Sequence, residues 1–356
     1  MSRRTSLARG GAERTASTTS ARTALATVCQ RGLTSTVLGQ ELRARLLRLL
    51  AFDAYCLNTC DTESGVVTSS VGDGLSPEQA RALFAIEADG TDLNLLSDLH
   101  RGPTRVASLW QTSGGHPEHS QRMREIFLPL GFGDELRAAL VADDICYGYL
   151  HLFRHRGQRS FSARDLLEVA ALGPIVARAL RFAASPTARG ATSRSNDSAL
   201  SRPALIVLDA ADRAVRQSAG AEALLGVCDT LRGESGIAHV LRDVASRSRR
   251  GDDARATFVT AQREPVTVAA LQVGDETMVV VTEPSTRELE VLTLAAFALT
   301  SREREVSRLV AAGLSNQRIA EELGIGLHTA KDHVKSVLTK TGCATRTELA
   351  ARLRGG

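Results

Sequence analysis

The sequence predicts a multidomain protein: an α+β sensor-type domain, a second α+β domain, and an all-α domain of four helices at the carboxyl end. The chain has 356 residues, enough for two or three domains of roughly 100–200 residues each. Strand-like and helix-like runs alternate before residue 285, whereas only the helical period continues after residue 300. Residues 184–203 are rich in Ser, Thr, Arg and Gly without any period, which predicts a linker.

Composition and charge narrow the class of protein. Apolar residues make up 43% of the chain and aromatic residues 4%, so its cores must depend on Leu, Val and Ala. No window is apolar over the ~18 residues that a membrane span needs, and the Arg- and Ser-rich start has no apolar run typical of a signal peptide. We therefore expect a cytoplasmic protein without membrane contact. Both ends are basic, which favours contact with a polyanion there: residues 1–30 hold five Arg and one Glu, and residues 300–356 hold ten Lys or Arg and six Asp or Glu.

The first α+β domain is expected to open with a helix, since leucines recur at helical spacing over 42–50. Strand patterns follow at 54–58 and 66–71. The Asp-Asp pair at 143–144 separates two further apolar runs and predicts a hairpin. A strongly periodic helix at 161–183 closes the domain.

The second α+β domain has a similar alternation of patterns. Strands at 204–209 and 213–218 precede a short helix at 219–226. Two more strands, 265–273 and 276–283, flank a Gly-Asp pair that suits a tight hairpin turn. The expected organisation is then a disordered basic tail at 1–32, the first domain at 33–183, the linker at 184–203, the second domain at 204–285, a connecting helix at 286–299, and the helical domain at 300–356.

The cysteines do not form a recognisable framework. Six are scattered along the chain, unlike the dense pattern of a small secreted domain. Cys56 and Cys60 lie on one expected strand, about 13 Å apart, which is too far for a disulfide. No CxxC motif or His-rich partner is near them in sequence, so we expect structural thiols, no metal site and no cofactor.

The carboxyl-terminal region carries clear helix boundaries. Thr300 with Glu303, and Thr345 with Glu348, each fit a capping box. Gly313 is placed to end the first helix. Ser315 is a candidate amino-terminal cap of the second helix, and a glycine at 324 can end it. These signals predict four short helices, near 301–312, 316–323, 327–341 and 345–353.

The third of these helices has two distinct sides. At 100° per residue, Ala330, Val334, Val337 and Leu338 share one arc, which must pack on the other helices. The short gap before this helix suits a helix-turn-helix, whose second helix enters the major groove of DNA. Lys donates to guanine acceptors and Asp accepts from cytosine, although a charged helix face is more often only solvated. The polar arc consists of His328, Lys331, Asp332, Lys335 and Thr339.

The segments LTSREREV, GLSNQRIAEELGI, HTAKDHVKSVLTK and RTEL resemble the DNA-binding domain of LuxR-type (GerE-like, FixJ-like) transcription regulators. The resemblance implies that Lys331, Asp332 and Lys335 contact bases, and that the helix from Arg346 to Leu353 is a dimer contact on DNA. His333 is not expected to read bases, and Cys343 is expected to pack. Residues implied near phosphates are Asn316, Thr329, Lys340 and Arg346; the helix-turn-helix core is expected at Val306, Ile319, Ala320, Leu323, Val334 and Leu338.

Three positions depart from the LuxR-type pattern. Gly326 stands where a Ser cap is usual, at a cost of a few tenths of a kcal/mol. Ala330 replaces a usual Val, and Thr341 a usual Leu. All three lie away from the reading face, so they bear on the stability of the domain rather than on its contacts.

The upstream domains resemble known sensors. The hairpin GFGDELRAALVADDICYGYLHLFR and the closing helix FSARDLLEVAALGPIVARAL are similar to parts of GAF domains. That resemblance implies a small-molecule pocket or a dimer contact, with Trp110, Phe127, Tyr147 and Tyr149 as pocket candidates, although an aromatic residue of this kind is more often part of a core. The opening ALIVLDAADRAVRQSAGAEALLG is similar to that of PAS domains.

These observations predict a sequence-specific, double-stranded-DNA-binding transcription regulator that forms a homodimer and receives a signal upstream. We expect no enzyme, because GxxxxGK, GxSxG and HExxH motifs are absent from the sequence. The acid pair at 143–144 is mid-chain, unlike that of a phosphorylated receiver. The alternatives are sigma-factor-like promoter recognition, a ligand-binding or enzymatic sensor with a vestigial helix-turn-helix, and a regulator that sequesters protein partners.

Overall fold

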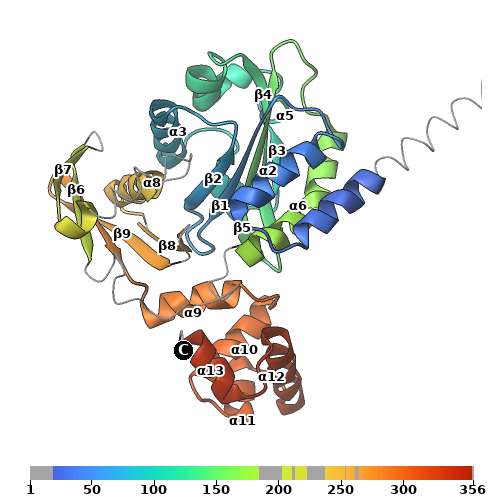
Figure 1. Cartoon of the computed structure of the whole chain (residues 1–356), viewed down its shortest axis with the longest axis vertical. Helices are drawn as coiled ribbons and strands as arrows, with labels where there is room; N and C mark the ends of the chain where they lie inside the picture. Colours follow the sequence, from blue (N-terminus) through green and yellow to red (C-terminus); the bar gives the residue numbers. More distant parts are fainter. Residues whose placement is uncertain are drawn as a thin grey trace, which may run out of the picture.

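The computed structural model describes residues 19–183, 203–210, 213–222, 237–252, 254–260 and 264–354. In this part of the chain, two five-stranded antiparallel sheets precede a group of short helices (Figure 1). The predicted order of two α+β units and a helical carboxyl-terminal unit is confirmed at this level. The expected linker, apart from its last residue, and the first eighteen residues of the expected tail lie outside the described residues.

The first sheet has the strand order β2-β1-β5-β4-β3. The hairpin predicted at residues 143–144 joins β4 to β5, and both turn residues have left-handed backbones, with φ of 51° at Asp143 and 63° at Asp144. Two-residue turns of this hand match the twist of antiparallel strands. The strands are β1 (Ala54–Cys60), β2 (Val67–Gly72), β3 (Val106–Ser108), β4 (Phe132–Ala142) and β5 (Ile145–His155).

Helices cover one face of this sheet, namely α2 (Ser35–Leu46) and α6 (Ala163–Ala183) (Figure 1). Their apolar stripes meet inward-facing strand residues such as Leu150 and Leu152 in one core. Ser162 accepts a hydrogen bond from the amide of Asp165 and caps the start of α6. The predicted closing helix is therefore present, whereas the helix expected over 42–50 begins earlier, at Ser35, and ends at Leu46.

An additional helix at residues 19–29 packs against the same core. The expectation of a disordered tail as far as residue 32 is wrong for this segment. Ala21, Leu25 and Val28 recur at helical spacing and are buried, which offsets the cost of ordering the chain. Arg22 also donates to the Glu168 carboxylate of α6 at 2.7 Å.

The other face of the first sheet carries short helices and turns. A capping box between Ser76 and Gln79 starts α3. A second apolar cluster here joins Phe127 to Phe153 of β5, with ring centroids 4.6 Å apart. The elements of this layer are α3 (Pro77–Asp89), α4 (Leu96–Arg101), α5 (Leu109–Thr112), the 3-10 turn η1 (Pro117–His119) and the π-helical turn η2 (Met123–Phe127).

The second sheet has the order β7-β6-β10-β9-β8, and α8 covers one face of it (Figure 1). The four strands that the alternation predicted are present, but α8 and β8 were not predicted. Only residues 219–222 of the expected helix at 219–226 are described, and they are helical. The elements are β6 (Ala204–Leu208), β7 (Ala214–Gln217), α8 (Ile237–Arg249), β8 (Arg255–Val259), β9 (Pro265–Val273) and β10 (Glu276–Thr282).

The turn between β1 and β2 of the first sheet packs against the second α+β unit. Val66 is fully buried and belongs to the core of the second unit. The Asp61 carboxylate accepts a hydrogen bond from the backbone amide of Thr257 at 3.0 Å. Arg247 of α8 donates to the carbonyl of Ser64 at 2.9 Å. The contact between the two α+β units therefore consists of one buried apolar side chain, Val66, and at least these two hydrogen bonds.

The connecting helix α9 (Thr286–Ala295) lies between the sheets and the terminal helices (Figure 1). It ends four residues earlier than expected, because Ala296 caps it and the chain turns toward Thr300. The Tyr147 hydroxyl donates to the Ala295 carbonyl at 2.9 Å. Arg304, in the first terminal helix, donates to the Asp143 carbonyl at 3.2 Å. The β4–β5 hairpin thus contacts both α9 and the terminal unit.

No helix in the described part of the chain is long and apolar enough to cross a membrane.

Candidate functional site

Four short helices form the terminal unit, with boundaries that agree with the sequence to within one residue. Thr300 and Glu303 make the predicted reciprocal capping box, and Ser315 caps the second helix by accepting from the Arg318 amide. A left-handed glycine ends the second helix at 324, with φ of 63°. The helices are α10 (Ser301–Ala311), α11 (Asn316–Leu323), α12 (Leu327–Thr341) and α13 (Arg346–Leu353).

One predicted cap is only half formed. Thr345 accepts from the Glu348 amide, but the Glu348 carboxylate bonds the amide of Ala344 at 2.8 Å instead of that of Thr345. At the start of α12, Gly326 makes no side-chain cap bond. The first turn of α12 therefore has the backbone bond from the Ala330 amide to the Gly326 carbonyl, at 3.0 Å, but no side-chain cap.

The inward side of α12 is buried in the core of this unit. Ala330 and Val337 are fully buried, and Cys343 packs in the same cluster. Among the expected core residues, Val306, Ile319, Ala320 and Val334 are buried, and Leu323 and Leu338 are partly buried against them.

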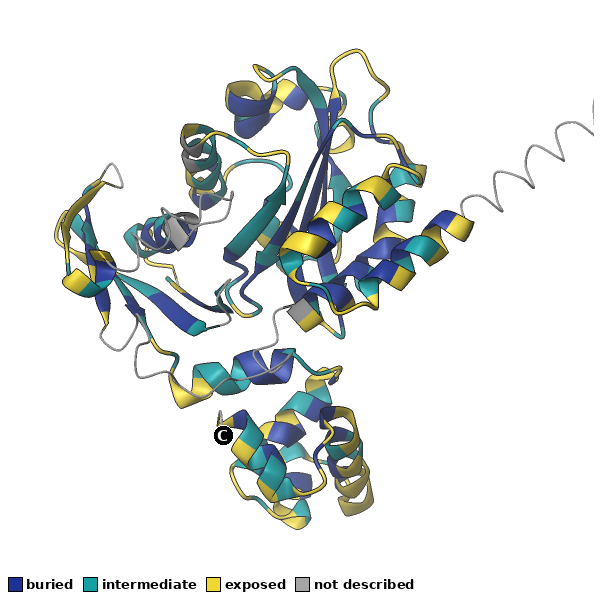
Figure 2. Ribbon diagram, viewed as in Figure 1, coloured by how far each residue is buried: buried dark blue, intermediate teal, exposed yellow. Residues whose placement is uncertain are grey.

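The opposite side of α12 faces outward. Lys331, Asp332 and Lys335 are all exposed, and they lie on α12, which is beside α10 at the outer edge of the terminal unit (Figures 1 and 2). The carboxylate of Asp332 is 3.5 Å from Nε2 of His328, one turn earlier. This surface offers two cationic donors and one acceptor within two helical turns, which is suited to the edges of base pairs in a major groove.

A buried carboxylate anchors the far end of α12. Glu303 accepts from Ser336 Oγ at 2.6 Å and from Lys340 Nζ at 2.7 Å. Burial alone would raise the pKa of Glu303, but hydrogen bonds from Lys340, Ser336 and Thr300 outweigh it and lower that pKa to about 2. Lys340, implied near phosphates, therefore already has an intramolecular partner.

Two other residues implied near phosphates contact each other. Arg346, at the start of α13, donates to the Asn316 side chain of α11 at 2.7 Å and also bonds the Leu314 carbonyl. The amino-terminal ends of α11 and α13 thus meet, and helix amino termini favour phosphate. Thr329 is exposed on the first turn of α12.

A separate cavity of about 560 Å³ lies in the first α+β unit. Cys56, Phe84 and Phe153 are among its apolar lining, and Arg137 and His151 are among its polar lining. Its volume is within the roughly 300–1,000 Å³ of small-molecule sites. Arg242 of α8 also lines it, so both α+β units contribute to the cavity.

Two of the polar lining residues, Arg137 and His151, belong to a buried network around Glu135. Arg122 and Arg137 both donate to its carboxylate. Burial alone would raise the pKa of Glu135, but the two guanidinium charges hold it well below its usual value. Burial lowers the pKa of His151, whose Nδ1 is 3.2 Å from Glu135. A neutral His151 that donates from Nδ1 leaves Nε2 as an acceptor.

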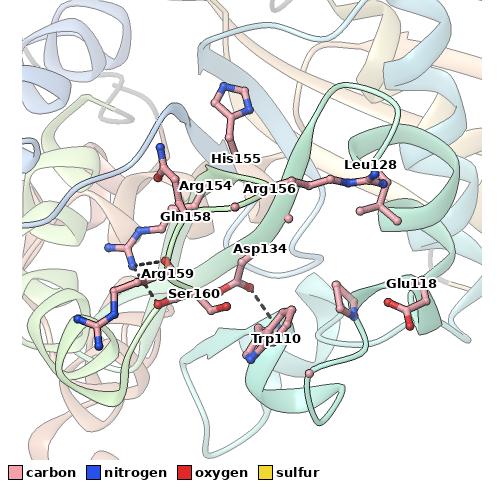
Figure 3. Close-up of a pocket in the computed structure, with 14 residues that line it drawn as sticks. Trp110, Glu118, Leu128, Asp134, Arg154, His155, Arg156, Gln158, Arg159 and Ser160 are labelled. Carbon is pink, nitrogen blue, oxygen red and sulfur yellow. Dashed lines mark hydrogen bonds between the residues drawn. The ribbon is translucent and has the colours of Figure 1, made fainter.

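A second hollow, about 720 Å³ in volume and lined by Trp110, Asp134 and Arg154, lies elsewhere on this unit (Figure 3). Two of its polar groups have partners within the protein: Asp134 accepts from the amides of Trp110 and Phe161, and Arg154 donates to the carbonyls of Arg159 and Ser160. These bonds hold the loop that follows β5 against the rest of the unit.

The four aromatic pocket candidates do not line one pocket. Phe127 lines the 560 Å³ cavity and Trp110 the second hollow. Tyr147 bonds α9 instead, and Tyr149 donates to the Gly65 carbonyl at 3.1 Å. Of the four aromatic candidates, Phe127 alone lines the 560 Å³ cavity. The buried polar pair at the same cavity, Arg137 and His151, gave no signal in the sequence.

The structure also brings together side chains that sequence reasoning kept apart. The Sγ atoms of Cys60 and Cys146 are 4.0 Å apart, and His100 adjoins both. A hydrogen bond from Cys60 lowers the pKa of Cys146 to about 5. His100 is not near Cys60 along the chain, and only the fold brings it beside the two thiols.

The terminal unit matches a known family. The model described as bacterial regulatory proteins, luxR family, matches residues 298–353, which form a LuxR-family helix-turn-helix. A monoamine regulon transcriptional regulator of Klebsiella aerogenes is 44% identical over 54 residues, 15% of this chain and 24% of that protein. The transcriptional regulatory protein LiaR of Bacillus subtilis is 42% identical over 53 residues, 15% of this chain and 25% of that protein.

A longer match is the tetrathionate response regulatory protein TtrR of Salmonella typhimurium, 33% identical over 90 residues, 25% of this chain and 43% of that protein. All three matches therefore span less than half of the relative's own length. A crystal structure of Escherichia coli SdiA aligns over 94% of this chain and 96% of that chain, with 14% identity and a TM-score of 0.32. A TM-score this low does not establish a shared fold.

Proposed function

We propose that this chain, whose residues 298–353 form a LuxR-family helix-turn-helix, is a sequence-specific DNA-binding transcription regulator. The observation that supports this most strongly is the exposed face of α12. Lys331, Asp332 and Lys335 point away from a core that the other three helices complete. In this proposal the protein acts in the cytoplasm and binds double-stranded DNA without catalysing a reaction.

The proposal assigns separate roles to the polar residues of this unit. Lys331 and Lys335 donate to base acceptors in the major groove, and Asp332 accepts from a base or excludes wrong ones. Thr329 and the joined pair of Asn316 and Arg346 position the helix through phosphates. The Lys340 ammonium has three N–H donors. One of them bonds Glu303, and the other two can contact a phosphate.

We further propose that the first unit is a GAF-like sensor and the second a PAS-like domain. In both sheets the strands lie in the same order relative to the chain: second, first, fifth, fourth and third.

The 560 Å³ cavity is the sensor site of the proposal. Nη2 of Arg137 and Nε2 of His151 are buried there without a hydrogen-bond partner in the described structure. A ligand with an apolar body, one acceptor and one donor satisfies both atoms.

Coupling between sensor and reader runs through contacts already described. Arg242 places α8 at the cavity, and the β4–β5 hairpin holds α9 through Tyr147 and α10 through Arg304. A ligand regulates DNA binding only if it binds two arrangements of these units with different affinity. We propose that the ligand shifts the position of the terminal unit in this way.

The proposed homodimer is supported by an uncovered apolar surface. On the face of the second sheet opposite α8, Leu271 is 58% exposed and Val273 is 53% exposed. Exposed apolar clusters favour association, and a two-fold dimer suits paired half-sites on DNA. Sedimentation of the wild type and of Leu271→Asp checks this: the variant should be monomeric, and an unchanged dimer would place the contact elsewhere.

The test of the function is selection from a pool of random DNA duplexes by the full-length chain at fixed physiological salt. Recovery of one motif, lost in the Lys331→Ala/Lys335→Ala double variant, is the expected result. Recovery of no motif with or without small-molecule extracts would favour a vestigial helix-turn-helix. A motif that needs RNA polymerase for its recovery would favour sigma-like promoter recognition.

The ligand site has its own test. Small molecules that raise the melting temperature of the wild type should fail to do so with Ser70→Phe, because Ser70 lines the cavity and the larger ring fills it. An equal shift in both proteins would place the ligand elsewhere.

A further inference from the structure

Cys60, His100 and Cys146 form a compact cluster between two strands and a helix of the first unit. Cys60 ends β1, Cys146 is near the start of β5, and His100 is on α4. One potential ligand atom from each residue lies within 4.8 Å of the other two. Both cysteines are buried, and His100 is partly exposed, so a small ion can reach the cluster from the histidine side.

The spacing of the two sulfur atoms fits a shared metal ion. Two thiolates bound at about 2.3 Å to one tetrahedral ion lie roughly 3.8 Å apart, and the observed Sγ–Sγ separation is 4.0 Å. A disulfide needs about 2.05 Å, so bond formation requires the two strands or rotamers to move, whereas the two sulfurs can bind one ion at their present separation. A histidine nitrogen beside two cysteines completes a donor set that suits Zn²⁺.

The total charge of the three donors also balances that of a divalent ion. Two thiolates and one neutral imidazole cancel a charge of +2, which keeps a buried site neutral. Asp61 is next to Cys60 in the chain, but its carboxylate accepts from the amides of Ser64 and Thr257. It is thereby held outside the donor set.

A surrounding layer orients the histidine. The Tyr149 hydroxyl is 3.3 Å from His100 Nδ1 and bonds the Gly65 carbonyl. Gly65 has a φ of +72°, and a Cβ there would lie 3.0 Å from the Tyr149 hydroxyl and 3.3 Å from His100 Nδ1. The glycine thus permits the close approach of these groups. Outer partners of this kind fix the ring orientation of metal-binding histidines.

We propose that Cys60, Cys146 and His100 form a binding site for a thiophilic divalent metal ion such as Zn²⁺, with the fourth position open to water. This inference does not depend on the proposed DNA-binding function. It has a structural consequence, because Cys60 adjoins the turn that enters the second unit at Val66, and Cys146 adjoins the hairpin that contacts α10. An ion at the site ties these two contacts together.

The experiment uses the full-length chain, stripped of metal with a chelator and kept reduced with a phosphine. Co²⁺ is titrated while the visible and near-ultraviolet absorbance is recorded. We expect one Co²⁺ per chain to give thiolate-to-cobalt charge-transfer bands, which Zn²⁺ then abolishes by displacement. The exposed group His116, Glu118 and His119 has no sulfur, so Co²⁺ bound there gives no such band.

Variants test the donor set. Cys60→Ser, Cys146→Ser and His100→Gln should each weaken Co²⁺ binding by more than the roughly 10–100-fold that a change outside the ligands costs. Tyr149→Phe should weaken it within that range. Cys56→Ser is the matched control, since Cys56 is on the same strand and bonds Ser70 instead. Circular dichroism of each variant shows whether it has folded.

The proposal is overturned if the reduced wild type gives no thiolate band. It is equally overturned if the band survives in folded Cys60→Ser and Cys146→Ser, or if Cys56→Ser removes it. A wild type that binds no Co²⁺ but forms a reversible Cys60–Cys146 disulfide on mild oxidation would replace the metal site by a redox pair.

Discussion

The Lys340 ammonium lies 2.7 Å from the Glu303 carboxylate and joins the end of α12 to the start of α10. The same carboxylate accepts from Ser336 and closes the capping box of α10 through the Thr300 amide. One buried side chain thus fixes both a helix start and the position of the proposed reading helix.

Replacing this carboxylate should loosen α12. Glu303→Gln keeps the size of the side chain but removes its charge, so we expect a loss of roughly 1–3 kcal/mol, which is typical of hydrogen bonds to charged groups. Amide hydrogen exchange of α12 peptides in the full-length chain should accelerate by about 5- to 150-fold. Glu305→Gln is the control, because Glu305 is 48% exposed and, among the described residues, its ion pair is with Arg302 one turn away. Equal acceleration in both variants would contradict the anchoring role.

The contribution of Glu303 should depend on pH in one direction. Its pKa is lowered from 4.5 to about 2, so its stabilisation is complete above pH 5 and is lost as the pH falls toward 2. The difference in α12 exchange protection between wild type and Glu303→Gln, corrected for intrinsic rates, should be constant from pH 6 to 8 and shrink below pH 5. A difference that grows on acidification would contradict this assignment.

The missing cap of α12 can be restored. A Cβ at Gly326 meets only the Thr329 hydroxyl, at 3.8 Å, and the backbone there is extended. Gly326→Ser should therefore stabilise α12 by a few tenths of a kcal/mol, and should exceed Gly326→Ala by about 1 kcal/mol. Hydrogen exchange of the first turn of α12 separates the two variants. Equal protection would show that residue 326 is not the cap.

The contact between the β4–β5 hairpin and α9 depends on one hydroxyl. Tyr147→Phe leaves the buried Ala295 carbonyl without its donor, which should cost about 1–3 kcal/mol and raise exchange at the end of α9. Tyr55→Phe is the matched control, because its hydroxyl bonds the Gly39 carbonyl within the first unit and should leave α9 unchanged. If Tyr147→Phe also leaves α9 unchanged, the hairpin does not hold this helix.

Features set by neighbouring residues could be predicted from the sequence. Thr300, Ser315 and Gly324 act as caps or helix ends through bonds to residues within one turn, so their positions in the chain were enough. The two faces of α12 were likewise visible from spacing alone. The helix at 19–29 was not predicted. Leu25 and Val28 have helical spacing, but the high Arg, Ser and Thr content around them is typical of a disordered tail.

Features set by pairing distant strands could not be predicted. Cys60 and Cys146 are 86 positions apart and meet only because β1 pairs with β5. In the described structure, Nη2 of Arg137 and Nε2 of His151 have no hydrogen-bond partner. Whether they have one depends on how Glu135 divides its bonds between Arg122 and Arg137. The pairing of Lys340 with Glu303 depends on the crossing of α10 and α12. None of these leaves a local pattern in the sequence.

The most direct measurement is the affinity of wild type and Lys335→Ala for the selected duplex and for a scrambled duplex, each over a range of salt concentrations. We predict that the variant loses roughly 1–3 kcal/mol on the selected duplex, with relaxed specificity and little change on the scrambled one. An equal loss on both duplexes, with a salt slope lower by about one, would mean that Lys335 meets only phosphate. Unchanged affinity for both would contradict the assignment of α12 as the reading helix.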